Sequence, residues 1–276
     1  MLTKCHSILV MSYWYLKELI LKENNTAIGI TVYSPNQEEL LNIKTLYNES
    51  FQFLYYLNSE IDKTFFNELD NVEFIGNGTN DGLGVAINSI AERAYQRNFK
   101  YLLILDQDTK CNIYELMQNV DDELTHFQKN AVAYHLNSKY RKRNKIGDFI
   151  INSSTVFDLE NFKKLGGMSS SYFLDGLDYD FCLRSWDQNM FIYSLPMMDY
   201  FDHNSLQDGL NLKIFNRKFN IRKYSQSRYK EIELSYRNAF LFSIRRKFYR
   251  AFMSLLKSYL IFKCSRLASK IIFIRG

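Results

Sequence analysis

The chain has 276 residues, of which 46% are hydrophobic and only 2 are proline. This length and composition allow a large domain with a sizeable core and argue against long disordered linkers. The net charge of +5 is unevenly distributed, because residues 211–276 carry 17 lysines and arginines against 2 acids, while residues 1–210 carry a net −10. An acidic body with a basic, aromatic tail predicts an anionic partner for the tail.

Cysteine spacing and hydropathy indicate which cellular compartment the sequence favours. The four cysteines lie far apart without a C-x-x-C pair, so they indicate neither a zinc site nor a disulfide framework and fit a reducing cytoplasm. The first twenty residues lack a clean apolar core and a small-residue cleavage site, so they are not interpreted as a signal peptide. No uninterrupted apolar run reaches 18 residues, so no membrane-spanning helix is expected.

The first half of the chain alternates between strand and helix patterns. Composition predicts an added N-terminal helix at 12–22, and the elements expected after it are strand 27–33, helix 37–47, strand 51–57, short helix 61–69, strand 72–75, helix 85–96 and strand 100–105. This alternation predicts an α/β fold with a mostly parallel, doubly wound sheet flanked by helices. Ligands of such sheets bind beyond the carboxyl ends of the strands.

The second half is less regular. Strands are expected within 126–135, 149–157 and 191–195, and a helix is expected in the segment LDYDFCLRSWDQN. The region beyond Asn211 is expected to be mostly helical. These patterns divide the chain into an N-terminal extension (1–25), a catalytic domain (26–210, with a donor half to about 110 and an acceptor half after it) and a basic helical tail (211–276).

The most informative motif is YLLILDQDT at 101–109. A short apolar run, as expected of a strand buried on both faces, ends at Asp106 and Asp108. Two acids at the end of a buried strand favour a bound divalent cation, because hard cations take carboxylate and phosphate oxygens together. The alternative is a pair of solvated acids in a turn.

Three further segments occur with this motif: NDGLGVAIN at 80–88, LGGMSSSYFLDGLDYDFCLR at 165–184, and His203. Together the four resemble family-2 glycosyltransferases of the GT-A fold, most of all bacterial rhamnosyltransferases of cell-surface polysaccharide synthesis. The resemblance covers about residues 27–238 and includes YRN at 236–238. It implies a GT-A fold, with a Rossmann-like nucleotide-sugar-binding sheet followed by a C-terminal helical tail.

The resemblance also implies roles for individual residues. Asp106 and Asp108 would hold Mn²⁺ or Mg²⁺ with the donor, and His203 would be a third metal ligand. Asp178 aligns with the catalytic base, and Asp180 is the alternative base, although an i,i+4 pair with Arg184 would make Asp180 structural. The remaining implied positions are Asn80 and Gly84 over the donor nucleotide and Gly166 and Gly167 in the acceptor loop. On charge alone, basic residues near Arg228 and Arg237 are candidates to cover the donor diphosphate once the donor binds.

The implied reaction is inverting transfer of a sugar to a glycan or lipid-linked acceptor. The donor expected from the resemblance is rhamnose linked to dTDP or UDP. The cation would neutralise charge on the departing diphosphate, and a carboxylate would take the proton of the acceptor hydroxyl. Two departures from the family pattern bear on the donor site: Leu57 stands where an aspartate usually precedes Asn58, and Ser34 replaces an asparagine.

Other interpretations remain open at this stage. A phosphatase of the haloacid dehalogenase type also places D-x-D-x-T after an apolar strand, with Asp106 as nucleophile. A degenerate glycosyltransferase-like subunit that binds without turnover is the non-enzymatic alternative, favoured by Leu57. For the basic tail, the two alternatives are a helix on an anionic membrane surface, giving a cytoplasmic protein peripheral to the inner face, or packing on the catalytic domain or a second subunit of a homo-oligomer. Nucleic-acid binding is not expected, because no recognisable nucleic-acid module accompanies the charge.

Overall fold

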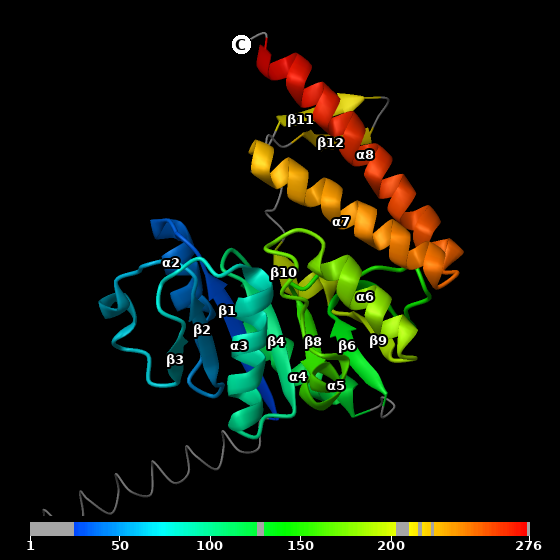
Figure 1. The fold of residues 1–276 in the computed structure, drawn as a ribbon. Helices are drawn as coiled ribbons and strands as arrows, with labels where there is room; N and C mark the ends of the chain where they lie inside the picture. Colours follow the sequence, from blue (N-terminus) through cyan, green and yellow to red (C-terminus); the bar gives the residue numbers. More distant parts are fainter. Residues whose placement is uncertain (1–24, 126–129, 203–209, 215–216, 222–223, 275–276) are drawn as a thin grey trace, which may run out of the picture.

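The computed structural model describes residues 25–125, 130–202, 210–214, 217–221 and 224–274 (Figure 1). Its centre is an eight-stranded sheet with the order β3-β2-β1-β4-β8-β6-β9-β7. The strands of this sheet are β1 (Thr26–Val32), β2 (Phe53–Leu57), β3 (Val72–Ile75), β4 (Tyr101–Asp106), β6 (Ala131–His135), β7 (Asn137–Arg143), β8 (Thr155–Asp158) and β9 (Phe191–Pro196). The helix expected at 12–22 lies outside the described residues.

Six of these strands run in one direction. β1 pairs in parallel with β2 and β4, β2 with β3, and β6 with β9. β8 is antiparallel to both β4 and β6, and β7 is antiparallel to β9. The expected mixed, mostly parallel α/β sheet is therefore confirmed. The carboxyl ends of six strands and the first residues of β8 and β7 consequently meet at one edge of the sheet.

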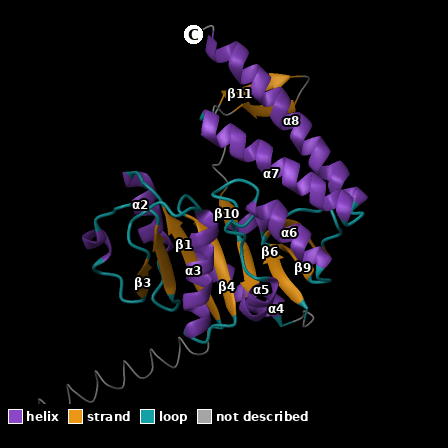
Figure 2. Cartoon of the chain, in the orientation of Figure 1, coloured by secondary structure: helices purple, strands orange, loops and turns teal. Residues whose placement is uncertain are grey.

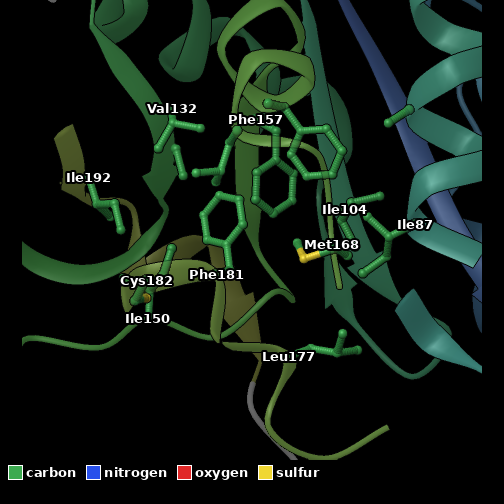
Figure 3. Close-up of a cluster of buried hydrophobic side chains, with 14 of the residues drawn as sticks. Ile87, Ile104, Val132, Ile150, Phe157, Met168, Leu177, Phe181, Cys182 and Ile192 are labelled. Carbon is green, nitrogen blue, oxygen red and sulfur yellow. The ribbon is translucent and has the colours of Figure 1, made fainter. Parts of the chain in front are cut away.

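Helices cover both faces because strand residues alternate between two cores. In β4, Leu102 and Ile104 contribute to one buried cluster, while Leu103 and Leu105 contribute to the other. Figure 2 shows α3 and α6 in front of the sheet, and Figure 3 shows the core contact between Phe157 of β8 and Phe181 of α6. The first cluster includes residues of α3 (Leu83–Gln96), α5 (Leu159–Leu165) and α6 (Leu177–Asp187), and the second includes α2 (Gln37–Leu46) and α4 (Ile113–Leu124).

Several elements differ from the sequence expectation. The short helix expected at 61–69 is a 3₁₀ turn, η1 (Lys63–Phe66), and a second 3₁₀ turn, η2 (Met198–Tyr200), follows β9. The strand expected at 149–157 is shorter in the structure, where only residues 155–158 pair in the sheet as β8. Residues 149–154 form the loop that leads into β8. The region beyond Asn211 is mostly helical, as expected, but it begins with a separate antiparallel hairpin of β11 (Leu210–Ile214) and β12 (Arg217–Ile221) that the sequence pattern did not indicate. α4, α5 and β7 likewise correspond to no element expected from the sequence.

The tail ends in two long helices, α7 (Gln226–Arg245) and α8 (Tyr249–Ile274), which extend away from the sheet beyond α6 (Figure 1). Tyr236 of α7 packs between the two neighbouring helices, with ring centroids 5.4 Å from Tyr179 of α6 and 5.2 Å from Tyr259 of α8. Glu233 of α7 forms ion pairs with Lys263 and Arg266 of α8. Among the described helices, none combines the length and apolar content needed to cross a membrane.

Candidate active site

The acidic turn after β4 lies at the shared carboxyl edge of the sheet. The Asp106 backbone N–H donates to Oγ1 of Thr109 at 3.1 Å, and the Thr109 N–H donates to the Asp106 carbonyl at 3.0 Å. The Gln107 side chain accepts from the Tyr33 N–H at 2.9 Å and donates to the Tyr33 carbonyl at 3.2 Å. The turn is therefore closed on itself and tied to the end of β1, which holds Asp106 and Asp108 at this edge.

Asp106 and Asp108 are both exposed to solvent, but their surroundings differ. Many protein atoms surround the Asp106 carboxylate behind its accessible surface, and this desolvation raises the pKa of Asp106 to about 6. A hydrogen bond from Ser153 opposes that rise in the pKa, and the charge of Asp108 adds to it. A cation at Asp106 would reduce this penalty by neutralising the charge of the crowded carboxylate.

Asp178 lies in the first turn of α6 and is half-buried. Its Oδ1 accepts from the backbone N–H of Asn152 at 2.9 Å. Burial raises the pKa of Asp178 to about 7, the hydrogen bond from Asn152 opposes this, and the charges of Asp106 and Asp175 raise the pKa further. The fold thus brings the acid of the acidic turn and the predicted base, which are 72 positions apart in the sequence, within electrostatic reach of each other.

The two acids near Asp178 are held by arginines. Asp180 forms an i,i+4 ion pair with Arg184 at 2.7 Å, and the same guanidinium donates to the carbonyls of Leu165 and Gly167 at 3.0 and 2.8 Å. The predicted pair therefore forms, and it ties α6 to the loop after α5. The ion pair with Arg184 favours a structural role for Asp180 over the role of catalytic base.

Arg228 also forms an ion pair with an acid near Asp178. Its guanidinium pairs with Asp175 at 3.0 Å and lies over the ring of Tyr224 at 4.6 Å. Burial raises the pKa of Asp175, and Arg228 lowers it. Arg237 lies on the exposed face of α7 and forms no ion pair with any described residue. Of the two arginines predicted to lie near the donor diphosphate, Arg228 is therefore already paired with Asp175, and Arg237 is exposed to solvent.

Asn80 lies at the same edge, in the turn that follows β3. The side-chain amide of Asn58 donates to Oδ1 of Asn80 at 3.0 Å, and Oδ1 of Asn58 accepts from the Asp81 N–H at 2.8 Å. Tyr56 also donates to the Asp81 carboxylate at 2.7 Å. The end of β2 therefore holds this turn through Asn58, while Leu57 is buried in the core.

Gly84 has a packing role in this fold. A Cβ at this position would lie 3.0 Å from both the Leu177 side chain and the Ser169 carbonyl. Glycine at this position therefore lets the first turn of α3 approach the 169–173 segment closely, and a larger residue would require these neighbours to shift. The Leu83 N–H donates to the Phe173 carbonyl at 2.8 Å, and this bond holds the start of α3 against the 169–173 segment.

Gly166 and Gly167 follow α5 and have left-handed backbone angles, with φ of 87° and 67°. They line a pocket of about 260 Å³ with residues of α3 and α5, including Asn88 and Phe162. Asp178 does not line this pocket; it lines another. The structure therefore does not place these glycines with the predicted base, because the turn that they form caps α5.

Asp178 lines an open pocket of about 550 Å³. Its other lining residues come from β6, β7 and β9, the 144–151 loop, α6 and α8. Asp106 and Asp108 do not line it. Asp178 therefore has the acidic turn in electrostatic reach and also borders this separate polar pocket.

His203 lies outside the described residues. The chain just before it forms β10 (Phe201–Asp202), which pairs in antiparallel fashion with β5 (Lys110–Cys111), so that Asp202 lies opposite Lys110. Among the described residues, no group of three or more histidines, cysteines and acids forms a metal-binding cluster. The acidic turn itself offers two carboxylates.

Two residues that contact the acids were not predicted. Asn152 donates its backbone N–H to Asp178, and Ser153 donates to Asp106. They belong to a polar N-S-S segment inside an apolar run, and the adjacent Ser154 has a positive φ of 55°. A left-handed serine is uncommon and marks a constrained turn. The polar interruption was the only sequence signal for this segment.

No family model and no curated protein matches this chain. Similar solved structures include GalNAc-T7 with UDP, GalNAc and Mn²⁺ (TM-score 0.47, 10% identity, covering 62% of this chain and 42% of that one) and S. aureus TarS 1–349 in complex with UDP-GlcNAc (0.48, 12%, 79% and 66%). A cytidylyltransferase from Leptospira borgpetersenii serovar Hardjo-bovis is also similar (0.40, 13%, 62% and 76%). The chain thus spans less than two thirds of GalNAc-T7 and TarS 1–349, and at these TM-scores the likeness does not assign a family.

Proposed function

We propose that the chain is an inverting, metal-dependent glycosyltransferase that acts on a nucleotide sugar. The observation that supports this most directly is the convergence of Asp106, Asp108 and Asp178 at the carboxyl edge of the sheet. Asp106 and Asp178 have raised pKa values, each chiefly because surrounding protein atoms desolvate the carboxylate, and the charge of Asp106 contributes to the pKa shift of Asp178. Paired acids with perturbed pKa values at a sheet edge are typical of catalytic sites.

The acidic turn fits a divalent cation. Mg²⁺ and Mn²⁺ favour oxygen ligands, and nucleotide-dependent enzymes commonly hold them with one or two carboxylates together with substrate phosphates. Asp106 and Asp108 supply that donor set, and the crowding of Asp106 by protein atoms favours a positive neighbour. The segment before His203 pairs with the segment after Asp108, which supports our proposal that His203 is a third ligand. When bound, the cation would neutralise negative charge on the donor diphosphate.

Asp178 is assigned the base. The acceptor hydroxyl oxygen forms a bond to the anomeric carbon, and the bond from that carbon to the diphosphate oxygen breaks. The electron pair of the broken bond leaves with the nucleoside diphosphate, and the hydroxyl proton passes to the Asp178 carboxylate. The hydrogen bond from Asn152 fixes the orientation of that carboxylate. A single displacement of this kind inverts the anomeric centre.

The donor in our proposal is rhamnose linked to dTDP or UDP, as the family resemblance implies. Asn80 and the Asn58 side chain that holds it lie at the edge where the nucleotide would bind. Tyr33, at the end of β1, is 49% exposed and is tied to the acidic turn through Gln107. These groups are candidates for base recognition in place of the aspartate that Leu57 replaces.

The acceptor in our proposal is a glycan, carried by a lipid at an anionic membrane surface. α8 contains five basic residues and no acid. Eight large hydrophobic side chains remain exposed on the two tail helices: Leu234, Leu241, Ile244, Tyr249, Met253, Leu260, Ile261 and Leu267. An exposed apolar stripe that includes the cation Lys257 suits the headgroup region of anionic lipid. The opposite side of α8 packs on α7, which leaves this stripe available for peripheral binding.

Thermal unfolding with ligands tests the proposal. We expect UDP or dTDP to raise the melting temperature only when Mn²⁺ is present, because the cation joins the two carboxylates to the diphosphate. Stabilisation should disappear in Asp106→Asn. No response to any nucleotide would instead favour a degenerate, non-catalytic subunit, and phosphate release from small phosphoesters would favour a phosphatase.

A further inference from the structure

The pocket beside Asp178 is built by parts of the chain that lie far apart in the sequence. His135 at the end of β6, Asn137 at the start of β7, and Ser254 and Ser258 of α8 all line its volume of about 550 Å³. The C-terminal helix therefore forms a wall of the same pocket that Asp178 borders. Residues of the tail contribute directly to the surroundings of the proposed base.

This wall of α8 is fixed to the catalytic domain. Arg250 forms an ion pair with Asp148 at 2.8 Å. A Cβ on Gly147 would lie 3.0 Å from the Arg250 backbone, so the loop and the helix touch through main-chain atoms. Gly147 has a φ of 96°, which further favours glycine at this contact. Ser254 lies one helical turn beyond Arg250 and therefore has a defined position over the pocket.

The pocket lining is rich in uncharged hydrogen-bonding groups. Hydroxyls, amides and an imidazole form a large part of the wall: Ser138, Ser194, Ser254, Ser258, Asn137 and His135. Beneath them, Ser194 donates to Oδ1 of Asn144 at 2.7 Å, and the Asn144 amide donates to the Asp148 carbonyl at 3.2 Å. The scaffold is thus held by its own bonds, while the Ser254 side-chain hydroxyl forms no hydrogen bond with any described residue.

Two aromatic side chains, Phe149 and Tyr179, also line the pocket, next to Ile150 and Ile151. Their rings meet edge to face with centroids 5.1 Å apart. A wall of hydroxyls and amides beside an apolar ring face matches a sugar, which offers hydroxyl groups around its rim and C–H bonds on its faces. A phosphate-binding pocket would instead gather cations, and here Lys142 is near Asp148, which lies 3.6 Å from its Nζ.

We propose that this pocket binds the acceptor as a neutral hexose ring, and that α8 supplies part of the acceptor site through Ser254. The inference rests on the proposed glycosyl transfer, in which Asp178 takes the proton of the acceptor hydroxyl. It differs from the expectation that Gly166 and Gly167 shape the acceptor site, because those glycines line a different pocket. The tail is then a part of the active site as well as a surface for lipid.

The test uses the full chain, a panel of dTDP- and UDP-sugars with Mn²⁺, and octyl glycosides of glucose, galactose and N-acetylglucosamine as acceptors. Ser254→Phe fills the pocket from α8, and Asn137→Leu removes hydrogen-bonding groups from the opposite wall at similar size. Each variant should raise the acceptor KM at least about tenfold, which corresponds to the loss of one or two good contacts. The KM for the donor and the slow hydrolysis of the donor by water should stay unchanged.

The matched control is Ser265→Phe, the same change on α8 at a residue that does not line the pocket. If Ser254→Phe fails to fold, Asn137→Leu still decides the question. Wild-type protein that hydrolyses a donor but glycosylates none of the octyl glycosides would overturn the pocket assignment, and so would variants with an unchanged acceptor KM. Wild-type protein that neither binds nor hydrolyses any nucleotide sugar would instead refute the glycosyltransferase proposal itself.

Discussion

Asp178 is the residue at which burial, charge and orientation act together. It lies at the start of α6, where the helix dipole favours a negative charge, yet burial and two neighbouring acids raise its pKa to about 7. A base with a pKa close to the working pH is half ionised and can accept a proton without holding it too tightly. Cation binding at Asp106 would lower the pKa of Asp178, since it cancels one of the repelling charges.

Asp178→Asn should abolish transfer while leaving nucleotide binding intact. The amide cannot accept the hydroxyl proton, so kcat should fall by about 10²–10⁴-fold. Binding of UDP or dTDP with Mn²⁺, measured by calorimetry, should change little because the base does not hold the nucleotide. Transfer within threefold of wild type would remove Asp178 from the role of base.

The raised pKa of Asp178 also predicts how stability depends on pH. The folded state holds the Asp178 proton more tightly than the unfolded state, so its contribution to stability is present below pH 3.8 and is lost as the pH rises to about 7. Relative to wild type, metal-free Asp178→Asn should therefore gain unfolding free energy between pH 5.5 and pH 8, by something on the order of 1 kcal/mol given partial solvent access.

Urea unfolding of both proteins at the two pH values measures this difference. Asp106 has a pKa shift of the same sign, and its main cause, desolvation, is present in both proteins, so most of its contribution cancels in the comparison. An equal stability difference at pH 5.5 and pH 8 would contradict a raised pKa at Asp178.

At the scale of elements, α6 carries one acid for chemistry and another for architecture. Asp178 contacts the 149–154 segment, whereas Asp180 points to Arg184 and, through it, to the carbonyls of Leu165 and Gly167. Residues two apart on a helix lie on different sides, so the two acids of the D-Y-D motif contact different parts of the protein.

Asp180→Asn should therefore give the opposite result to Asp178→Asn. Loss of a half-buried, hydrogen-bonded ion pair should lower the unfolding free energy by about 1 kcal/mol. Transfer activity should stay within a few-fold of wild type, because the proposed base is intact. Urea unfolding and initial rates on the same preparations check both halves. Asp180→Asn with no transfer but normal stability would exchange the two assignments.

At the scale of the whole molecule, six parallel strand ends and two antiparallel strand starts gather the site at one edge. The tail helices then lean over α6 and reach the same region through α8. Exposed apolar side chains remain on both helices, together with the exposed Lys257 on α8. The proposed acceptor pocket and the proposed lipid-facing stripe therefore lie on neighbouring sides of one helix, as expected for a lipid-carried acceptor.

Membrane binding follows as a prediction for the intact chain. The double variant Leu260→Glu and Ile261→Glu should lose at least about tenfold in affinity for vesicles that contain 30% phosphatidylglycerol, because it places charge in the apolar stripe. The control is Leu41→Glu, an equally exposed leucine on α2. Co-sedimentation measures the binding. Equal binding by the double variant, or no binding by wild type, would contradict lipid contact at this face.

The sequence by itself determined the parallel half of the sheet and its acidic turn. These features depend on contiguous residues: an apolar run such as Leu102–Leu105 dictates a buried strand, and the acids that follow must lie at its end. The spacing of Asp180 and Arg184 likewise determined their ion pair, since four helical residues bring the two side chains together.

Only the tertiary structure decided which distant residues meet. Reversal of β8 brings Ser153 to Asp106 and Asn152 to Asp178, and no local pattern specifies that a strand runs antiparallel. The same holds for α8, whose serines reach the Asp178 pocket because packing on α7 and the contact of Arg250 with Asp148 set its position. Periodicity reports which face of an element is buried, but not against what it is buried.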